Sequence, residues 1–94
     1  MDDKERSAGN FDTQLAYIKE RIESLKAAAA AKGPQVLDHY AGDLQRLLEK
    51  YETARYKLTL LRKGSGDALS ELRGGFENAL TDVKTAVTKA WNKF

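Results

Sequence analysis

The sequence contains no cysteine, and among its 94 residues there are only one proline, one histidine and one tryptophan. The lack of cysteine excludes disulfides, thiol catalysis and cysteine-based zinc sites. Long hydrophobic runs are also lacking: the longest is the five alanines at 27–31, runs of large aliphatic residues are of the Leu60-Leu61 kind, and the first ten residues are mostly polar and charged. Neither a membrane span nor a signal peptide is therefore expected. These absences predict a cytoplasmic protein.

An excess of charge of one sign is missing too. Sixteen Lys and Arg residues stand against fourteen Asp and Glu residues, which leaves a net charge of +2. That surplus is too small for the electrostatic footprint of a dedicated nucleic-acid binder, so nucleic acid is not an expected partner.

Residues for catalysis are scarce. His39 is the only histidine, and no serine has a base at a telling spacing, so no catalytic residue and no enzymatic activity is predicted. His39 and Asp43 have the i, i+4 spacing of two metal ligands on a helix, but two ligands do not make a site. We therefore predict no metal site and no cofactor.

The strongest positive feature is a heptad pattern over residues 37–61. Its apolar positions recur at alternating steps of three and four residues, which places them on one stripe of a helix. This packing seam comprises Leu37, Tyr40, Leu44, Leu47, Tyr51, Ala54, Leu58 and Leu61. Such a stripe predicts a long helix that packs along its length against other helices.

The remaining chain predicts two more helices. Residues 1–10 show no periodicity and are expected to form a disordered tail. The single helical domain, 11–94, then contains helices at about 11–31, 35–63 and 67–93. Glycine and proline at Gly33-Pro34 favour a break between the first two helices, and Gly64-Ser65-Gly66 forms the second loop.

The predicted fold is all-α, an antiparallel three-helix bundle or coiled coil with short turns. The alternative is a helical hairpin, in which Pro34 kinks one long helix that pairs with a shorter one. In the third helix, Gly74-Gly75 coincides with a slip in the apolar spacing, which indicates close packing or a bend at that point.

The charges beside the seams are mostly basic. Heptad positions e and g include Lys19, Arg21 and Lys26 in the first helix, whereas Glu20 and Glu23 point away from the seam. The second helix repeats this arrangement with Lys50, Arg55, Lys57 and Arg62. Opposite charges that would select a partner are missing from these flanks, and the seams are narrow there. We expect a homodimer or a larger assembly of this chain, with an unidentified protein as a further partner.

An alternative use of the helices is reversible binding to an anionic membrane surface. A helix with an apolar stripe, basic borders and an acidic centre can lie in a membrane interface, as apolipoprotein helices do. The third helix is the best candidate, and its predicted membrane face comprises Phe76, Leu80, Val83, Lys84, Val87, Trp91, Lys93 and Phe94.

The third helix also resembles a known family. The run Gly66-Asp67-Ala68-Leu69, continued through Gly74-Gly75-Phe76-Glu77 to Ala90-Trp91, is similar to the C-terminal pattern of small bacterial coiled-coil proteins of a stress-response family. Gly33-Pro34 departs from the uninterrupted helix expected in that family. The resemblance implies a non-enzymatic, helical and oligomeric protein linked to stress, and it transfers no catalytic or binding residue. The predicted function is therefore a coiled-coil interaction or structural protein.

Overall fold

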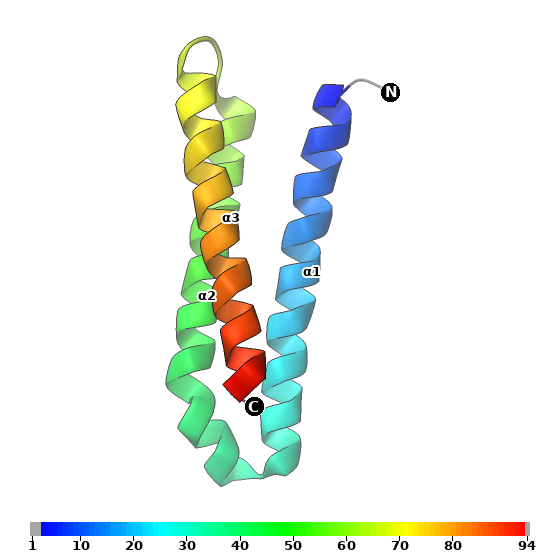
Figure 1. The fold of residues 1–94 in the computed structure, drawn as a ribbon, viewed down its shortest axis with the longest axis vertical. Helices are drawn as coiled ribbons and strands as arrows, with labels where there is room; N and C mark the ends of the chain where they lie inside the picture. Colours follow the sequence, from blue (N-terminus) through cyan, green and yellow to red (C-terminus); the bar gives the residue numbers. More distant parts are fainter. Residues whose placement is uncertain (1–2, 94) are drawn as a thin grey trace.

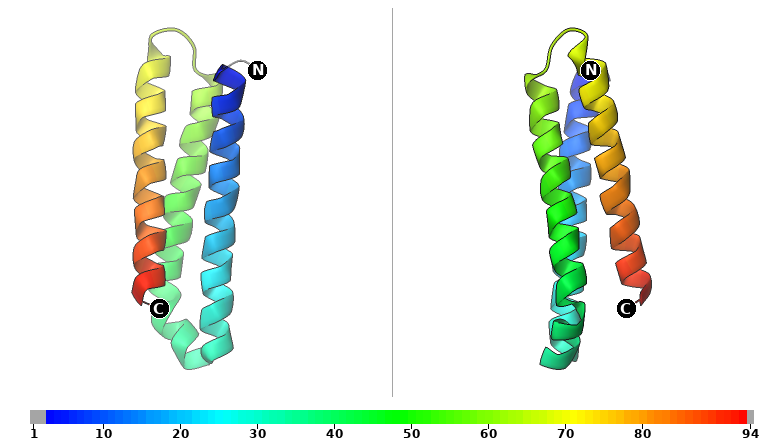
Figure 2. Two further views of the ribbon diagram at one scale, coloured as in Figure 1. Left: turned by 45° about the vertical axis from the view of Figure 1, so that its right-hand side comes forward. Right: turned by 90° about the vertical axis from the view of Figure 1, so that its left-hand side faces the viewer.

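The protein is a bundle of three helices, seen in a computed structural model that describes the backbone of residues 3–93 and the side chains of residues 11–93. The helices are α1 (Asp3–Lys32), α2 (Pro34–Lys63) and α3 (Ala68–Lys93). Successive helices run antiparallel, so that α1 and α3 are parallel (Figure 1). The turned views in Figure 2 show the three helices side by side in a rod that measures 50 × 24 × 18 Å. The predicted all-α, antiparallel three-helix bundle is confirmed.

A single residue, Gly33, separates α1 from α2. Its φ of 124° and ψ of 162° lie in a region that only glycine adopts without strain. The Gly33 amide donates to the Ala30 carbonyl at 3.1 Å, and the Gly33 carbonyl accepts from the Leu37 amide at 3.1 Å. Pro34 occupies the first turn of α2, where its missing N–H costs nothing. The chain therefore reverses here, and the kinked-helix alternative is wrong.

The start of α1 differs from the prediction. The helix begins at Asp3 rather than near residue 11, so residues 3–10 belong to α1, while residues 1 and 2 of the predicted tail lie outside the described residues. Residues 3–10 have no apolar period because this part of the helix does not need an apolar face. Once the packed turns after residue 10 have nucleated a helix, adding further turns costs little, and no proline precedes Pro34 to stop it.

The core lies between the three helices and includes the central part of the predicted seam of α2. Buried residues of α2 are Leu44, Leu47, Tyr51, Ala54 and Leu58. Those of α1 are Leu15, Ile18, Ile22, Leu25 and Ala29, and those of α3 are Phe76, Leu80, Val83, Val87 and Ala90. Helix α2 packs closely on both neighbours, whereas α1 and α3 touch each other less. The heptad seam of α2 is thus the centre of this bundle.

Two glycines in the second turn of α3 have open space around them. The helix continues without interruption through Gly74 and Gly75. A Cβ atom built at either position would meet no heavy atom within 4 Å. The close packing predicted there is therefore wrong. Gly64, in the loop before α3, is different, because a Cβ there would collide with the Leu72 side chain.

Candidate functional site

The predicted membrane face of α3 is largely inside the bundle. Phe76 and Val83 are completely buried, and Leu80 and Val87 are only 6% and 4% exposed. Phe76 also packs edge-to-face on Phe11 of α1, with ring centroids 4.7 Å apart. The structure therefore contradicts this face as a ready-made membrane surface, because α1 and α2 take up its apolar stripe.

The polar and aromatic edge of the same face is accessible. Lys84 and Lys93 are exposed, Trp91 is half-buried, and Phe94 lies outside the described residues. Lys84 donates to Gln14 of α1. Only this edge of the predicted face can reach a partner while the bundle is closed.

The α2 seam is likewise engaged within the chain. The seam positions from Leu44 to Leu58 are buried, and the outer ones, Leu37, Tyr40 and Leu61, are partly buried against the same core. The Tyr40 hydroxyl donates to the Lys93 carbonyl at 3.1 Å, which joins the start of α2 to the end of α3. A partner must therefore use other surfaces of the folded bundle.

Two of the seam-flanking cations find acidic partners that the sequence analysis missed. Arg62 of α2 pairs with Asp12 of α1, and this hydrogen bond raises the pKa of the Arg62 guanidinium above its usual value. Lys50 of α2 pairs with Asp82 of α3 at 2.6 Å. The heptad pattern was applied only to the lysines, arginines and glutamates. Placing Asp12 and Asp82 on it as well would have predicted opposite charges across these flanks.

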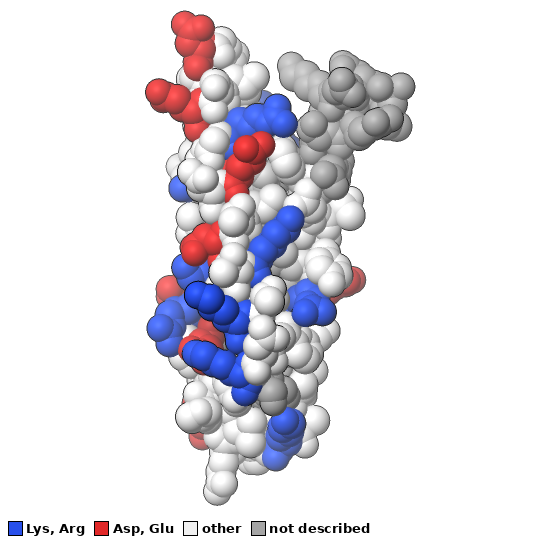
Figure 3. All heavy atoms as spheres, viewed as in Figure 1, with Lys and Arg blue, Asp and Glu red and all other residues white. Residues whose placement is uncertain are grey.

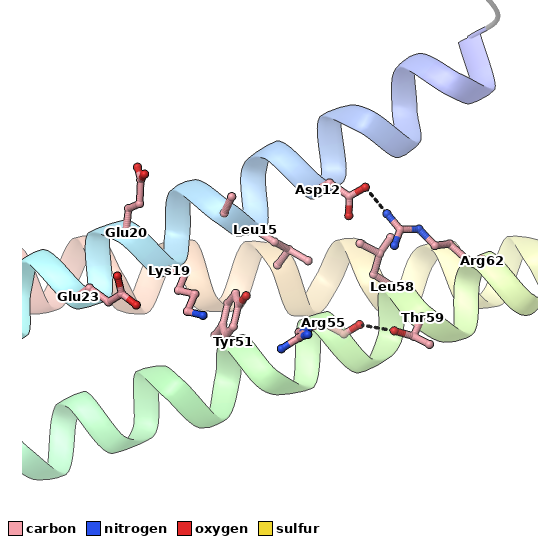
Figure 4. A pocket seen from close by; sticks show the side chains of 11 residues that line it. Asp12, Leu15, Lys19, Glu20, Glu23, Tyr51, Arg55, Leu58, Thr59 and Arg62 are labelled. Carbon is pink, nitrogen blue, oxygen red and sulfur yellow. Dashed lines mark hydrogen bonds and ion pairs between the residues drawn. The ribbon is translucent and has the colours of Figure 1, made fainter.

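One large depression is the α1–α2 groove, a volume of about 580 Å³ on the flank where these two helices meet. It is lined by Asp12, Leu15, Ala16, Lys19, Glu20, Glu23, Tyr51, Arg55, Leu58, Thr59 and Arg62. Lys19 and Arg55 approach from opposite helices and point into the space beside Tyr51 (Figure 4). Glu20 and Glu23 also belong to this lining, although the Glu20 carboxylate points away from α2, as expected (Figure 4). The groove therefore combines an apolar floor with charges of both signs.

A second, smaller depression is the α2–α3 groove, of about 170 Å³. It is lined by Asp43, Arg46, Leu47, Lys50, Ala86, Lys89, Ala90 and Lys93. Asp43 pairs with Arg46 at 2.9 Å, and Asp82 pairs with Lys50 from just beside the groove. Lys89 and Lys93 have no ion pair with any side chain from 11 to 93. The α2–α3 groove thus carries a local excess of positive charge.

The uneven charge of α3 is visible in the space-filling view. Basic side chains gather over the half of α3 nearest the C-terminus, and acidic ones lie mostly toward its N-terminal half (Figure 3). The order along the sequence is the same, with Glu71 in the first turn and Lys93 in the last. This order suits the helix dipole, and the fold adds Arg46 and Lys50 of α2 to the basic end.

A cluster of aromatic and basic side chains joins α1 to α3. The Arg21 guanidinium lies 5.1 Å from the centre of the Trp91 ring and 5.8 Å from that of Tyr17. Tyr17 is 58% exposed. Arg21 is half-buried, and its cation–π contacts with these two rings were not predicted from the heptad pattern. Arg21 and Tyr17 also line a shallow groove of about 220 Å³ with Lys84.

Comparison of the chain with protein-family models, with curated proteins and with solved structures finds no match. The surfaces described above are therefore the basis for assigning a function.

The described residues contain no cluster of three or more His, Asp or Glu side chains that could hold a metal ion. His39 and Asp43, the pair with the spacing of metal ligands, have other partners. The Asp43 carboxylate accepts a hydrogen bond from Arg46, and the His39 ring lies edge-to-face on Tyr40 with ring centroids 5.1 Å apart. No helix in the described part of the chain has the length and apolar character needed to cross a membrane.

Proposed function

We propose that this chain is a non-enzymatic interaction protein, which works as a folded bundle and binds an acidic protein surface through the α2–α3 groove. The observation that carries the proposal is the gathering of Arg46, Lys50, Lys89 and Lys93 on one groove with only Asp43 among them. Because the heptad seam is used in the core, the interaction surface has to lie on the outside of the helices.

The chemistry of the groove favours an acidic partner. Lys89 and Lys93 are exposed, and no acid of the described chain neutralises them. Long lysine side chains next to the small residues Ala86 and Ala90 leave room for a helix or an extended segment to approach. Exposed lysines such as these mainly raise the rate at which an acidic partner associates and help to select that partner. Their effect falls as the salt concentration increases.

A comparison of three immobilised proteins tests the proposal. The wild-type bundle, the double variant Lys89→Glu with Lys93→Glu, and the control Lys63→Glu are exposed to the same cell extract at low and high salt. Lys63 lies in the last turn of α2, at the other end of the bundle. We expect an acidic partner to be retained by the wild type and the control and lost from the double variant. Equal retention by all three proteins would contradict the proposal.

Reversible binding to an anionic membrane surface is a second candidate. The supporting observation is the cluster of Tyr17, Arg21 and Trp91 with Lys84 beside it, since aromatic rings with a polar edge and neighbouring cations suit the membrane interface. In this candidate the bundle stays closed and touches the lipid with its α1–α3 side.

Sedimentation with lipid vesicles separates the two candidates. Salt-sensitive binding to vesicles that contain acidic lipid, reduced by Arg21→Gln with Lys84→Gln and absent with neutral lipid, supports the membrane candidate. No binding to acidic vesicles at low salt rejects it. The link to stress is part of the proposal only through the resemblance of residues 66–91, and partner capture from stressed and unstressed cells tests that link.

A further inference from the structure

The α1–α2 groove holds two cations that face each other without an acidic partner. Lys19 and Arg55 point into the space beside Tyr51 from opposite helices (Figure 4). Neither forms an ion pair with a side chain of residues 11–93. Two like charges on neighbouring helices repel each other. A carboxylate supplied from outside the chain would be stabilised at this point.

The same flank of the bundle also carries carboxylates, displaced along the helix axis. Glu23 follows Lys19 by one turn of α1 and lines the groove. Glu52 precedes Arg55 by three residues of α2 and is exposed, and this spacing puts both side chains on one side of the helix. Neither acid is bonded to its basic neighbour in the described structure. The groove therefore has a basic level and, one turn away, an acidic level.

The relative heights of these residues follow from the ion pair between Asp12 and Arg62. Helices α1 and α2 are antiparallel. Lys19, seven residues after Asp12 in α1, therefore lies level with Arg55, seven residues before Arg62 in α2. By the same count Glu23, one turn after Lys19, lies level with Tyr51. Glu52 is the residue next to Tyr51, so Glu23 and Glu52 lie at nearly the same height. Consider a two-fold axis that is perpendicular to the helices and lies halfway between these two levels. It would place the basic level of one molecule opposite the acidic level of the other.

We propose that a second copy of this chain docks on the α1–α2 groove in an antiparallel orientation. Lys19 of each copy then faces Glu23 of the second copy, and Arg55 faces Glu52 of the second copy. The patch is self-complementary, as a symmetric dimer interface must be. The four charge pairs remove the repulsion that each chain carries alone.

An exposed leucine fits the same arrangement. Leu48 is 43% exposed and lies on the groove side of α2, seven residues before Arg55. The two-fold axis brings it against the neighbourhood of Thr59 of the second copy, which removes apolar surface from water. Since the rod is 50 Å long and 24 Å wide, its broad side can supply the roughly 800 Å² per partner that a stable interface buries.

The mass of the chain in solution tests whether this dimer forms. The mass of the full chain is measured by light scattering and sedimentation equilibrium over a wide concentration range at low and high salt. We expect a dimer that weakens as salt increases. Lys19→Glu with Arg55→Glu should weaken the dimer by at least about tenfold, since each change acts twice across the axis.

The exchange variant Lys19→Glu with Glu23→Lys should keep the dimer, because residue 19 of each copy still faces a residue of opposite charge at position 23 of the second copy. Lys89→Glu, on α3, is the matched control and should leave the dimer unchanged while it weakens partner binding in the α2–α3 groove. Helical circular dichroism verifies that each variant is folded.

A wild-type chain that stays monomeric at the highest concentration overturns the proposal. So does a dimer that is insensitive to the double reversal, or a folded exchange variant that remains monomeric. Binding of free glutamate or of an acidic peptide in the groove, without any dimer, would assign the two cations to a different occupant and would likewise overturn it.

Discussion

The two adjacent glycines of α3 offer a direct test of the fold. Gly74 and Gly75 lie in the interior of a continuous helix, neither has a positive φ, and a Cβ at either position would meet no heavy atom within 4 Å. Alanine at these positions therefore introduces no strain and no collision. We predict that the double variant Gly74→Ala with Gly75→Ala is more stable than the wild type.

The size of the effect follows from helix propensity. Glycine is about 0.8–1 kcal/mol less favourable than alanine per helix-interior position, mainly because of the larger conformational entropy of its unfolded state. Two substitutions should add about 1.5–2 kcal/mol to the free energy of unfolding. In a domain of this size, each kcal/mol raises the melting temperature by roughly 4–8 °C.

Urea and thermal unfolding followed by circular dichroism at 222 nm measure this gain. The slope of the free energy with urea should stay constant, so that a shift of the midpoint reports stability. Gly33→Ala is the opposite control: its φ of 124° should make alanine destabilising by about 1–3 kcal/mol. Unchanged or reduced stability in the Gly74 and Gly75 double variant would refute the reasoning, because it would require a neighbour that packs on these glycines.

Three further predictions concern single contacts. Phe76→Ala, at a completely buried position, should lower the free energy of unfolding by about 3–5 kcal/mol, whereas Tyr56→Ala, 64% exposed, should change it by less than about 0.5 kcal/mol; urea unfolding compares the two. A double-mutant cycle on Lys50 and Asp82 should give a coupling of about 0.2–1 kcal/mol, since the pair is solvent-exposed, and a coupling above about 2 kcal/mol would contradict that reading. Tyr40→Phe should cost about 0.5–1.5 kcal/mol through the lost hydrogen bond to the Lys93 carbonyl, and hydrogen exchange in the last turn of α3 should rise.

The packing of the helices was predictable because it depends on period. The steps of three and four from Leu37 to Leu61 place one stripe inward whatever the neighbours are, and in the structure its positions from Leu44 to Leu58 are buried while the outer ones are partly buried. The break at Gly33 was also predictable, since glycine and proline act on the local backbone. The start of α1 was not, because a helix that extends beyond its packed part leaves no trace in the apolar period.

The surfaces were harder to predict because they depend on two helices at once. The pairing of Arg62 with Asp12 needs the antiparallel register of α1 and α2, which no single-helix pattern contains. The contact of Arg21 with Trp91 likewise needs α1 and α3 to lie parallel. An apolar stripe such as that of α3 favours burial in a core and is also compatible with a lipid surface, so its fate depends on the stripes that the other helices offer.

The single-residue connection at Gly33 has a consequence for how fast the chain folds. With almost no loop to close, α1 and α2 can meet as soon as both have begun to form, and the entropy lost in bringing them together is small. The four residues 64–67 then place α3 on the same surface. Such short connections give a low contact order, which is typical of proteins that fold within microseconds to milliseconds. A longer, flexible linker in place of Gly33 should slow folding measured by temperature jump.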